Sequence, residues 1–309
     1  MLPFKEDAGP GLNIYVFLAL GVAAISTGAI FIRLAHAPPL VIAAYRVGIA
    51  TLVILPFGIW KKGDELRRLK LADLKLAFLA GFFLALHFAT WVSSLAFTSV
   101  ANSVILVNTN PIWVGILAPF VTGERLKPAT VSGILISVIG AAFIGAGDAA
   151  GGGDALWGDF LAVMGGLCAA GYLLVGKQLR RKLSLIAYIS VCYGSAAVIL
   201  WPTVLLLGYP VTGFDAQTYQ ALVGMALVAQ LVGHTTYNWA LKYVSTPLVA
   251  VSLLGEPVGS SLMAYVLFQE SLGWAELAGG AMVLLAIYLT AAGERKPRRS
   301  GLTNARQDG

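Results

Sequence analysis

Charged residues and cysteines are both scarce in this chain of 309 residues. Only 12% of the residues are charged and 58% are hydrophobic, whereas a soluble domain is about half apolar and about a quarter charged. This composition excludes an ordinary soluble protein and indicates an integral membrane protein. The two cysteines, Cys168 and Cys192, both lie inside apolar segments, so we expect buried thiols rather than a disulfide framework or a metal site.

The motifs of common enzymes are also absent. The chain contains no HExxH, no GxSxG and no paired CxxC sequence. Residues 171–177 have the glycine spacing of a phosphate-binding loop, but Gln178 replaces the required hydroxyl and the segment follows no strand. A membrane-embedded enzyme, for instance a lipid group transferase, would need reactive side chains near one interface together with a metal or nucleotide motif. We therefore expect a protein that is not an enzyme and uses no cofactor.

Apolar runs long enough to cross a membrane fill most of the chain. A transmembrane helix needs about 20 apolar residues to span a hydrocarbon core of about 30 Å. The sequence predicts an all-α protein with ten such spans, at residues 13–34, 39–59, 76–98, 100–121, 130–147, 157–176, 184–206, 218–240, 246–268 and 274–292. The connections are short, so no soluble domain is expected, and no cleavable signal peptide is evident before the first span.

Three segments outside the spans have distinctive compositions. Residues 60–75 are expected to form a short amphipathic piece on the membrane surface. Residues 145–158, which include three consecutive glycines, are expected to be a flexible joint. This divides the chain into a first half of residues 1–150, a second half of residues 151–293, and a basic cytoplasmic tail of residues 294–309 that is predicted to be disordered.

Lysine and arginine occur in alternate connections. If there are ten spans, one side of the membrane receives Lys5, six basic residues between 61 and 75, Arg125, Lys127, four between 177 and 182, Lys242, and five between 295 and 306. The opposite connections carry no lysine and only Arg33, at the end of the first span. By the positive-inside rule both termini are cytoplasmic. The net charge of +6 therefore indicates a lipid bilayer as partner rather than nucleic acid.

The two halves contain a repeat. Pro257 follows Pro111 by 146 positions, and the same shift aligns Trp91 with Tyr237 and Glu124 with Glu270. Each half has five predicted spans, and because five is odd the second copy must cross the membrane upside down. Such inverted repeats are typical of secondary transporters, whose sites lie at the interface between the repeats.

Two predicted spans are interrupted at mid-membrane. The first interruption reads Asn108-Thr109-Asn110-Pro111, and the second reads Leu254-Gly255-Glu256-Pro257. Proline removes a backbone hydrogen bond, and polar side chains at membrane depth usually line a path or a site. We expect the two interruptions to form halves of one binding site.

These residues resemble the EamA family of the drug/metabolite transporter superfamily. The likeness is carried by residues 91–97, 100–111 and 120–126 in the first half, and by residues 246–257 and 267–272 in the second. The resemblance implies ten helices in two inverted repeats, a central cavity lined mainly by spans one, three, four, six, eight and nine, and efflux of small metabolites including amino acids. Its many candidate cavity aromatics resemble those of bacterial exporters of aromatic amino acids.

Charged and amide side chains inside the spans have two interpretations. Asn108 and Asn110 either satisfy backbone groups near Pro111 or contact a substrate. Glu256 is either a structural or gating partner near Pro257, which we favour slightly, or a carboxylate that couples protons or binds an amine. Arg46 either snorkels outward or forms an internal salt bridge, or it clamps a substrate carboxylate.

Aromatic residues recur at helical spacing near these groups. Phe83, His87 and Trp91 are four residues apart, and Gln230 and His234 share a face that Tyr237 and Asn238 continue. Such aromatic stripes are usually side chains that pack between helices. Histidine and amide side chains are unfavourable in contact with lipid, so we favour the interpretation that these stripes line a cavity. The candidate substrate-binding residues are Phe83, His87, Trp91, Asn108, Asn110, Trp113, Tyr172, His234, Tyr237, Asn238 and Ser252; no metal ligand is expected.

Together these features predict an exporter of small organic metabolites in the bacterial inner membrane. It would work by alternating access, as a monomer or weak homodimer, on amino acids and in particular aromatic ones. Broad drug or cation efflux is the alternative within the transporter class. A channel-like facilitator also remains open, because a carrier and a pore both need a polar path.

Overall fold

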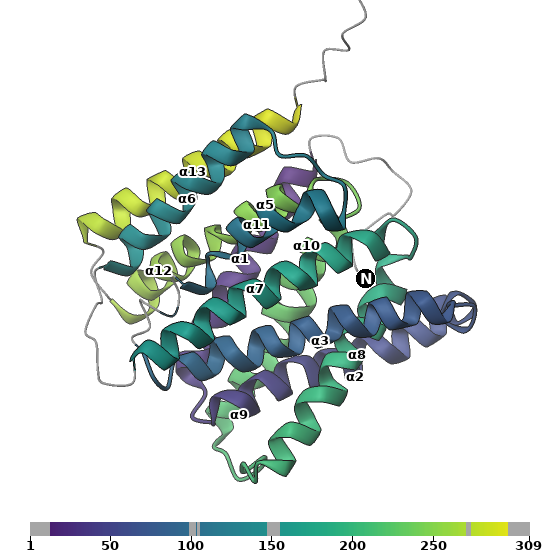
Figure 1. Ribbon diagram of the computed structural model, residues 1–309. Helices are drawn as coiled ribbons and strands as arrows, with labels where there is room; N and C mark the ends of the chain where they lie inside the picture. The colour runs from purple at the N-terminus through teal and green to yellow at the C-terminus, as the bar shows by residue number, and fades with distance from the viewer. Residues whose placement is uncertain (1–12, 99–102, 104–105, 147–154, 270–272, 296–309) are drawn as a thin grey trace, which may run out of the picture.

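The computed structural model describes residues 13–98, 103, 106–146, 155–269 and 273–295, and every regular element within these ranges is a helix (Figure 1). The predicted all-α class is therefore confirmed. Residues 99–102 and 104–105, which include part of the predicted fourth span, and the tail from residue 296 lie outside the described residues. So do residues 147–154 of the predicted joint at 145–158, whose first two and last four residues belong to helices.

The helices of the first half follow the predicted spans closely. They are α1 (Asn13–Leu34), α2 (Pro39–Arg67), α3 (Leu71–Ser94), α5 (Asn110–Val121) and α6 (Pro128–Ala146). In the region of the predicted amphipathic piece, residues 60–75, α2 has a kink at Lys62, where φ is −132°, and a short helical stretch continues from there to Arg67 before α3 starts at Leu71. Its place on the membrane surface stays a prediction.

In the second half, two of the predicted spans are each divided into shorter helical segments. They are α7 (Ala155–Arg180), α8 (Leu185–Leu206), α9 (Ala216–Gly224), the π-helical segment η1 (Met225–His234), α10 (Thr235–Ala240), α11 (Thr246–Leu253), α12 (Gly255–Phe268) and α13 (Trp274–Arg295). The predicted span 218–240 is the run α9–η1–α10, and the predicted span 246–268 is the pair α11–α12. The π-helical middle was not predicted. Such wide turns occur frequently at functional sites.

Within the described residues, six helical segments are long and apolar enough to cross a membrane. They are residues 14–34, α2, α3, α7, α8 and the α11–α12 pair, and α5 and parts of α6 and α13 form shorter apolar helices. Large apolar side chains also cover the outer surface; Phe120 is 85% exposed and Leu206 is 87% exposed. A soluble protein would not expose so many apolar side chains, so the surface fits a multi-pass membrane protein.

The helices at two opposite edges of the molecule pack closely against one another. Helices α6 and α13 run side by side along one edge, and α2, α3 and α8 form the opposite edge (Figure 1). At the first edge, a β-carbon at Gly140 would lie 2.8 Å from the carbonyl oxygen of Gly279. At the other, a β-carbon at Gly81 would lie 2.5 Å from the carbonyl oxygen of Cys192. Glycine is what allows these backbones to approach, and α1, α5, α7, α11 and α12 lie between the two edges (Figure 1).

Candidate functional site

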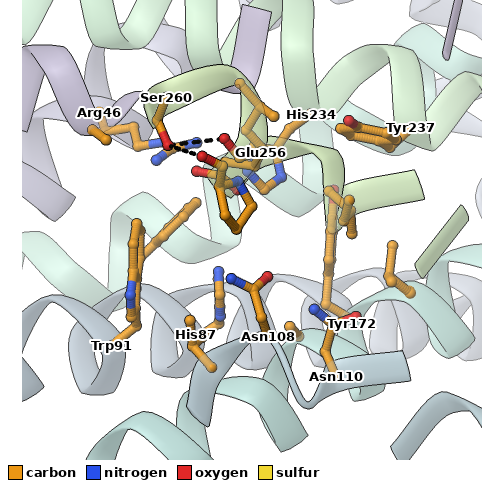
Figure 2. A pocket seen from close by; sticks show the side chains of 18 residues that line it. Arg46, His87, Trp91, Asn108, Asn110, Tyr172, His234, Tyr237, Glu256 and Ser260 are labelled. Carbon is orange, nitrogen blue, oxygen red and sulfur yellow. Dashed lines mark hydrogen bonds between the residues drawn. The ribbon is translucent and has the colours of Figure 1, made fainter. Parts of the chain in front are cut away.

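A cavity lies between α1, α2, α3, α7, the junction of η1 with α10, the chain just before α5 and the junction of α11 with α12. Its volume is about 800 Å³, including the open space at its mouth. The wall contains apolar side chains from α1, α7 and α11 and a larger set of polar and aromatic ones. The polar and aromatic members are Arg46, His87, Phe88, Trp91, Asn108, Asn110, Tyr172, His234, Tyr237, Glu256 and Ser260 (Figure 2).

Both predicted interruptions are confirmed, and both reach this cavity. Residues 108 and 109 form a turn, and α5 starts at Asn110 with Pro111 in its first turn. In the second half α11 ends at Leu253, one residue forms a turn, and α12 starts at Gly255. Proline fits the first turn of a helix because its missing N–H has no partner there. The interruptions thus place Asn108 and Asn110 on one side of the cavity and Glu256 on the other (Figure 2).

Glu256 presents its carboxylate to the cavity. Its backbone carbonyl accepts hydrogen bonds from the hydroxyls of Ser26 on α1, at 3.2 Å, and Ser260, at 2.9 Å. The carboxylate oxygens form no hydrogen bond or ion pair with any described residue. The backbone at the interruption is therefore held by serine hydroxyls, and the acid group is free for another partner.

Arg46 lies in the cavity wall and not at the membrane surface. Its side chain is only 3% exposed, so the outward-snorkelling interpretation is wrong. Its Nε donates a 2.7 Å hydrogen bond to Oε1 of Gln230, and its guanidinium lies 4.3 Å above the centre of the Phe88 ring. Arg46 and Glu256 attract each other electrostatically, but within the described chain Arg46 forms no ion pair.

Aromatic rings form a second side of the cavity. The rings of His87 and Trp91 are stacked, with centres 5.9 Å apart and planes 9° apart. Nδ1 of His87 lies 3.0 Å from the carbonyl oxygen of Gly165; because a carbonyl can only accept, this nitrogen carries the proton. The Phe88 ring meets His234 edge-on at 5.5 Å. The helical spacing noted in the sequence therefore does bring His87 and Trp91 together.

Several buried polar atoms of the wall have no hydrogen-bond partner among the described residues. They are Nη2 of Arg46, Nε1 of Trp91, Oδ1 of Asn110 and the hydroxyl of Tyr237. Buried polar atoms are nearly always paired in folded proteins. Donors and an acceptor gathered around one cavity are therefore suited to a polar ligand.

Four candidate residues do not line the cavity, which corrects the sequence-based set. Phe83 packs against α7, where its ring would lie 2.9 Å from a β-carbon at Gly171. A four-residue step overshoots one helical turn by about 40°, so residues eight apart are turned by about 80°. Phe83 is consequently turned by about 80° from Trp91 and contacts α7 at Gly171 instead of the cavity.

Trp113, Asn238 and Ser252 are likewise elsewhere. Trp113 packs partly buried against the main apolar core. Asn238 is fully buried behind Tyr237, and its Nδ2 donates to the hydroxyl of Tyr193 at 3.1 Å. Ser252 donates to the carbonyl of Leu248 on its own helix at 2.8 Å. Trp113 and Asn238 follow a cavity-lining residue by three positions and one position, and Ser252 directly precedes the cavity-lining Leu253. A position next to a lining residue on a helix faces a different direction.

The sequence analysis also missed two wall residues. Phe88, which directly follows His87, was not among the predicted site residues. Ser260 lies one turn after Glu256 on α12, and that i, i+4 spacing was a usable signal. Tyr172, His234, Tyr237 and Pro257 lie in the wall as expected, and Pro111 is buried at the start of α5.

A polar cluster lies outside the cavity, where the end of α5 meets α7 and the start of α11. Nζ of Lys177 lies 3.3 Å from Oε1 of Glu124 and donates a 2.6 Å hydrogen bond to the carbonyl of Val244. Oε2 of Glu124 accepts from the hydroxyl of Thr122 and from the backbone N–H of Thr246, which begins α11. We call these five residues the latch. It joins the end of α5 to α7 and α11.

Side chains at the end of α7 also donate hydrogen bonds to backbone carbonyls at the end of α5. Gln178 donates to the carbonyl of Val121 at 2.5 Å, and Arg181 donates to the carbonyl of Thr122 at 3.2 Å. Along α7, Lys177 is five residues from Tyr172, or about 7.5 Å. The latch therefore lies directly beyond the cavity wall.

Within the described residues no group of three or more histidine, cysteine, aspartate or glutamate side chains is arranged to hold a metal ion. Both cysteines are free and buried, which agrees with the expectation of buried thiols.

Comparison with known proteins gives a consistent result. The model of the EamA-like transporter family matches residues 12–146 and again residues 156–292. An uncharacterized transporter of Archaeoglobus fulgidus is 25% identical over 285 residues, which covers 90% of this chain and 97% of the relative. The uncharacterized transporter YyaM of Bacillus subtilis is 25% identical, with 91% and 94% covered.

A solved structure described only as a crystal structure of a protein has the same fold. Its TM-score is 0.77 at 17% identity, and the match covers 92% of this chain and 99% of that one. The two family matches together cover nearly the whole sequence. The chain therefore belongs to the EamA-like transporter family and is a multi-pass membrane transporter.

Proposed function

We propose that this protein is a secondary exporter of amino acids, and of aromatic amino acids in particular, in the inner membrane. The observation that carries the proposal is the composition of the cavity wall. One buried cation, one carboxylate and a stacked aromatic pair face the same space. An aromatic amino acid carries the complementary groups: a carboxylate, an ammonium group and a ring that stacks on aromatic faces.

The proposed mechanism is alternating access between two inverted five-helix halves, with both termini in the cytoplasm. The two separate family matches support this division. So do the residues paired by the 146-position shift, because Trp91 with Tyr237 and Asn110 with Glu256 all line the same cavity. Substrate at a repeat interface, beside interrupted helices, is the usual arrangement in such transporters.

The latch supports the same mechanism. It ties α5 of the first half to α7 and α11 of the second, just beyond the cavity. With the proposed orientation it lies on the cytoplasmic side. For a substrate to enter from the cytoplasm, the Glu124–Lys177 pair and the contact with Thr246 have to separate. The latch is thus the cytoplasmic gate of the cycle.

A substrate-panel assay in reconstituted vesicles tests the proposal. Purified protein is placed in liposomes loaded with labelled phenylalanine, tryptophan, alanine or glutamate, with and without a proton gradient. We expect saturable efflux of the aromatic amino acids, faster than from protein-free liposomes. If aromatic amino acids neither move nor compete with a substrate that does move, the assignment is wrong.

Broad efflux of organic cations is the second candidate. The free Glu256 carboxylate beside aromatic rings favours it, because carboxylates and aromatic faces both attract cations. Protection of cells against many unrelated cationic drugs, without transport of amino acids, would support it. A channel-like facilitator would instead give flux that does not saturate.

A further inference from the structure

We infer that Gln230 is a specificity-determining residue that acts through Arg46, by positioning the Arg46 guanidinium to bind the carboxylate of the substrate. The inference rests on the proposed function, since it concerns how the same cavity selects its ligand. Gln230 is fully buried and is not part of the cavity wall. It is a positioning residue behind the wall.

The contact between the two side chains has only one chemically possible orientation. Nε of Arg46 lies 2.7 Å from Oε1 of Gln230. Arginine has donors only, so the amide oxygen has to face it. The hydrogen bond uses Nε of the guanidinium and leaves its terminal nitrogens for other partners.

Phe88 fixes the plane of the same group. The guanidinium carbon lies 4.3 Å above the centre of the Phe88 ring, a cation–π contact. Gln230 thus holds the guanidinium at Nε and Phe88 contacts one of its faces. One donor remains unused, because Nη2 is buried and has no hydrogen-bond partner in the described structure. Carboxylates bind arginine through such terminal donors, often two at a time.

The neutrality of Gln230 matters as much as its position. A glutamate there would pair with Arg46 and cancel its charge, whereas an amide holds the guanidinium and leaves the charge in place. Taking a cation out of water is costly unless an anion pairs with it. Since Glu256 forms no ion pair with Arg46, a carboxylate on the ligand would supply the missing partner.

This geometry also orients the ligand. Its carboxylate lies at Arg46, its ammonium group is near Glu256, and its ring lies toward the stacked pair His87 and Trp91 (Figure 2). The π-helical segment η1 carries Gln230 behind Arg46 and His234 into the wall. One turn of this segment therefore serves both the anion subsite and the aromatic wall.

Three matched ligands test the inference on purified, detergent-solubilised protein. They are phenylalanine, phenethylamine, which lacks the carboxylate, and 3-phenylpropionate, which lacks the ammonium group. Dissociation constants are measured by titration calorimetry for the wild type, Gln230→Glu, Gln230→Met and, as control, Gln217→Glu on the exposed start of α9. Gln230→Glu keeps the acceptor and so preserves the fold, which is checked by the melting temperature.

We expect both Gln230 variants to bind phenylalanine and 3-phenylpropionate at least tenfold more weakly, and phenethylamine within twofold of the wild type. The control should match the wild type for all three ligands. Equal weakening of the binding of all three ligands would show that Gln230 has a merely structural role. Unchanged binding of phenylalanine and 3-phenylpropionate by Gln230→Glu would overturn the inference. So would a wild type that binds neither of these two carboxylates. If the wild type binds carboxylates selectively but vesicles show no transport, the proposed function fails and the inference stands.

Discussion

Lys177 and Glu124 form an ion pair with Nζ and Oε1 3.3 Å apart, and both side chains are nearly buried, at 9% and 15% exposure. The pair connects the end of α5, in the first half of the chain, to α7, in the second half. It also holds the first backbone N–H of α11, which has no partner within its helix. This contact therefore stabilises the described conformation, and in the proposed mechanism it has to break during transport.

Removing one partner of the pair should destabilise this conformation. Lys177→Met leaves a buried carboxylate without its cation, and the loss of a buried partner costs about 3 kcal/mol. We expect a clear drop in the melting temperature for Lys177→Met and for Glu124→Gln. The double variant should be more stable than the sum of the two single effects predicts, because neither charge is then left alone. Strictly additive effects would show that the two residues do not interact.

Glu256→Gln should change ligand binding but leave the fold intact. Its carboxylate has no bond to any described residue, so the amide breaks no internal contact. We expect binding of phenethylamine to weaken about tenfold while 3-phenylpropionate binds as before. This is the opposite of the pattern expected for Gln230 variants. Asp64→Asn, at the exposed end of α2, is the matched control. Unchanged affinity for phenethylamine would remove Glu256 from the binding site.

Gly166 on α7 should be intolerant of any side chain. A β-carbon there would lie 2.8 Å from the carbonyl oxygen of Val107, in the segment that leads to the interruption before α5. We expect Gly166→Ala to lower the melting temperature and to impair binding at Asn108 and Asn110. Gly63 has no atom within 4 Å of its β-carbon position. Gly63→Ala should therefore be neutral or stabilising, by at most about 1 kcal/mol. Equal effects at both sites would contradict the packing.

Asp215, outside the membrane spans, gives a local pH dependence. It begins α9, and the backbone N–H of Thr218 donates to Oδ1 at 2.7 Å. This hydrogen bond, followed by those from the Thr218 hydroxyl and His36, lowers the pKa of Asp215 below its usual value. A lowered pKa means that the stabilisation is present at neutral pH and is lost as the pH falls through the folded-state pKa.

Hydrogen exchange at the start of α9 measures this effect. Protection should decrease on acidification in the wild type, and Asp215→Asn should remove that dependence on pH. Protection that does not change with pH in the wild type would contradict the capping role.

Much of the fold could be predicted because apolar spans and prolines leave strong local signals. Pro111 and Pro257, each preceded by a polar residue, located both interruptions to within one or two residues. The π-helical segment left no such signal. Its wide turns depend on packing against α1 and α2, which residues 225–234 alone do not encode.

The candidate site was predicted less completely, for geometric reasons. Rules based on i, i+4 spacing found His87 and Trp91 but wrongly added Phe83, because the angular error grows with each turn. The partners of Arg46 were out of reach, since Gln230 is 184 positions away in the sequence. Contacts between helices of this separation can be assigned only from the folded structure.

Counterflow exchange tests the central claim most directly. Vesicles containing the wild type are loaded with excess unlabelled phenylalanine, and entry of external labelled phenylalanine is followed over time. A carrier with one substrate cavity should give transient accumulation above equilibrium that saturates with external concentration. Trp91→Ala and Gln230→Glu should reduce it, whereas Gln217→Glu should not. Entry that never exceeds equilibrium and rises linearly with concentration would contradict the account.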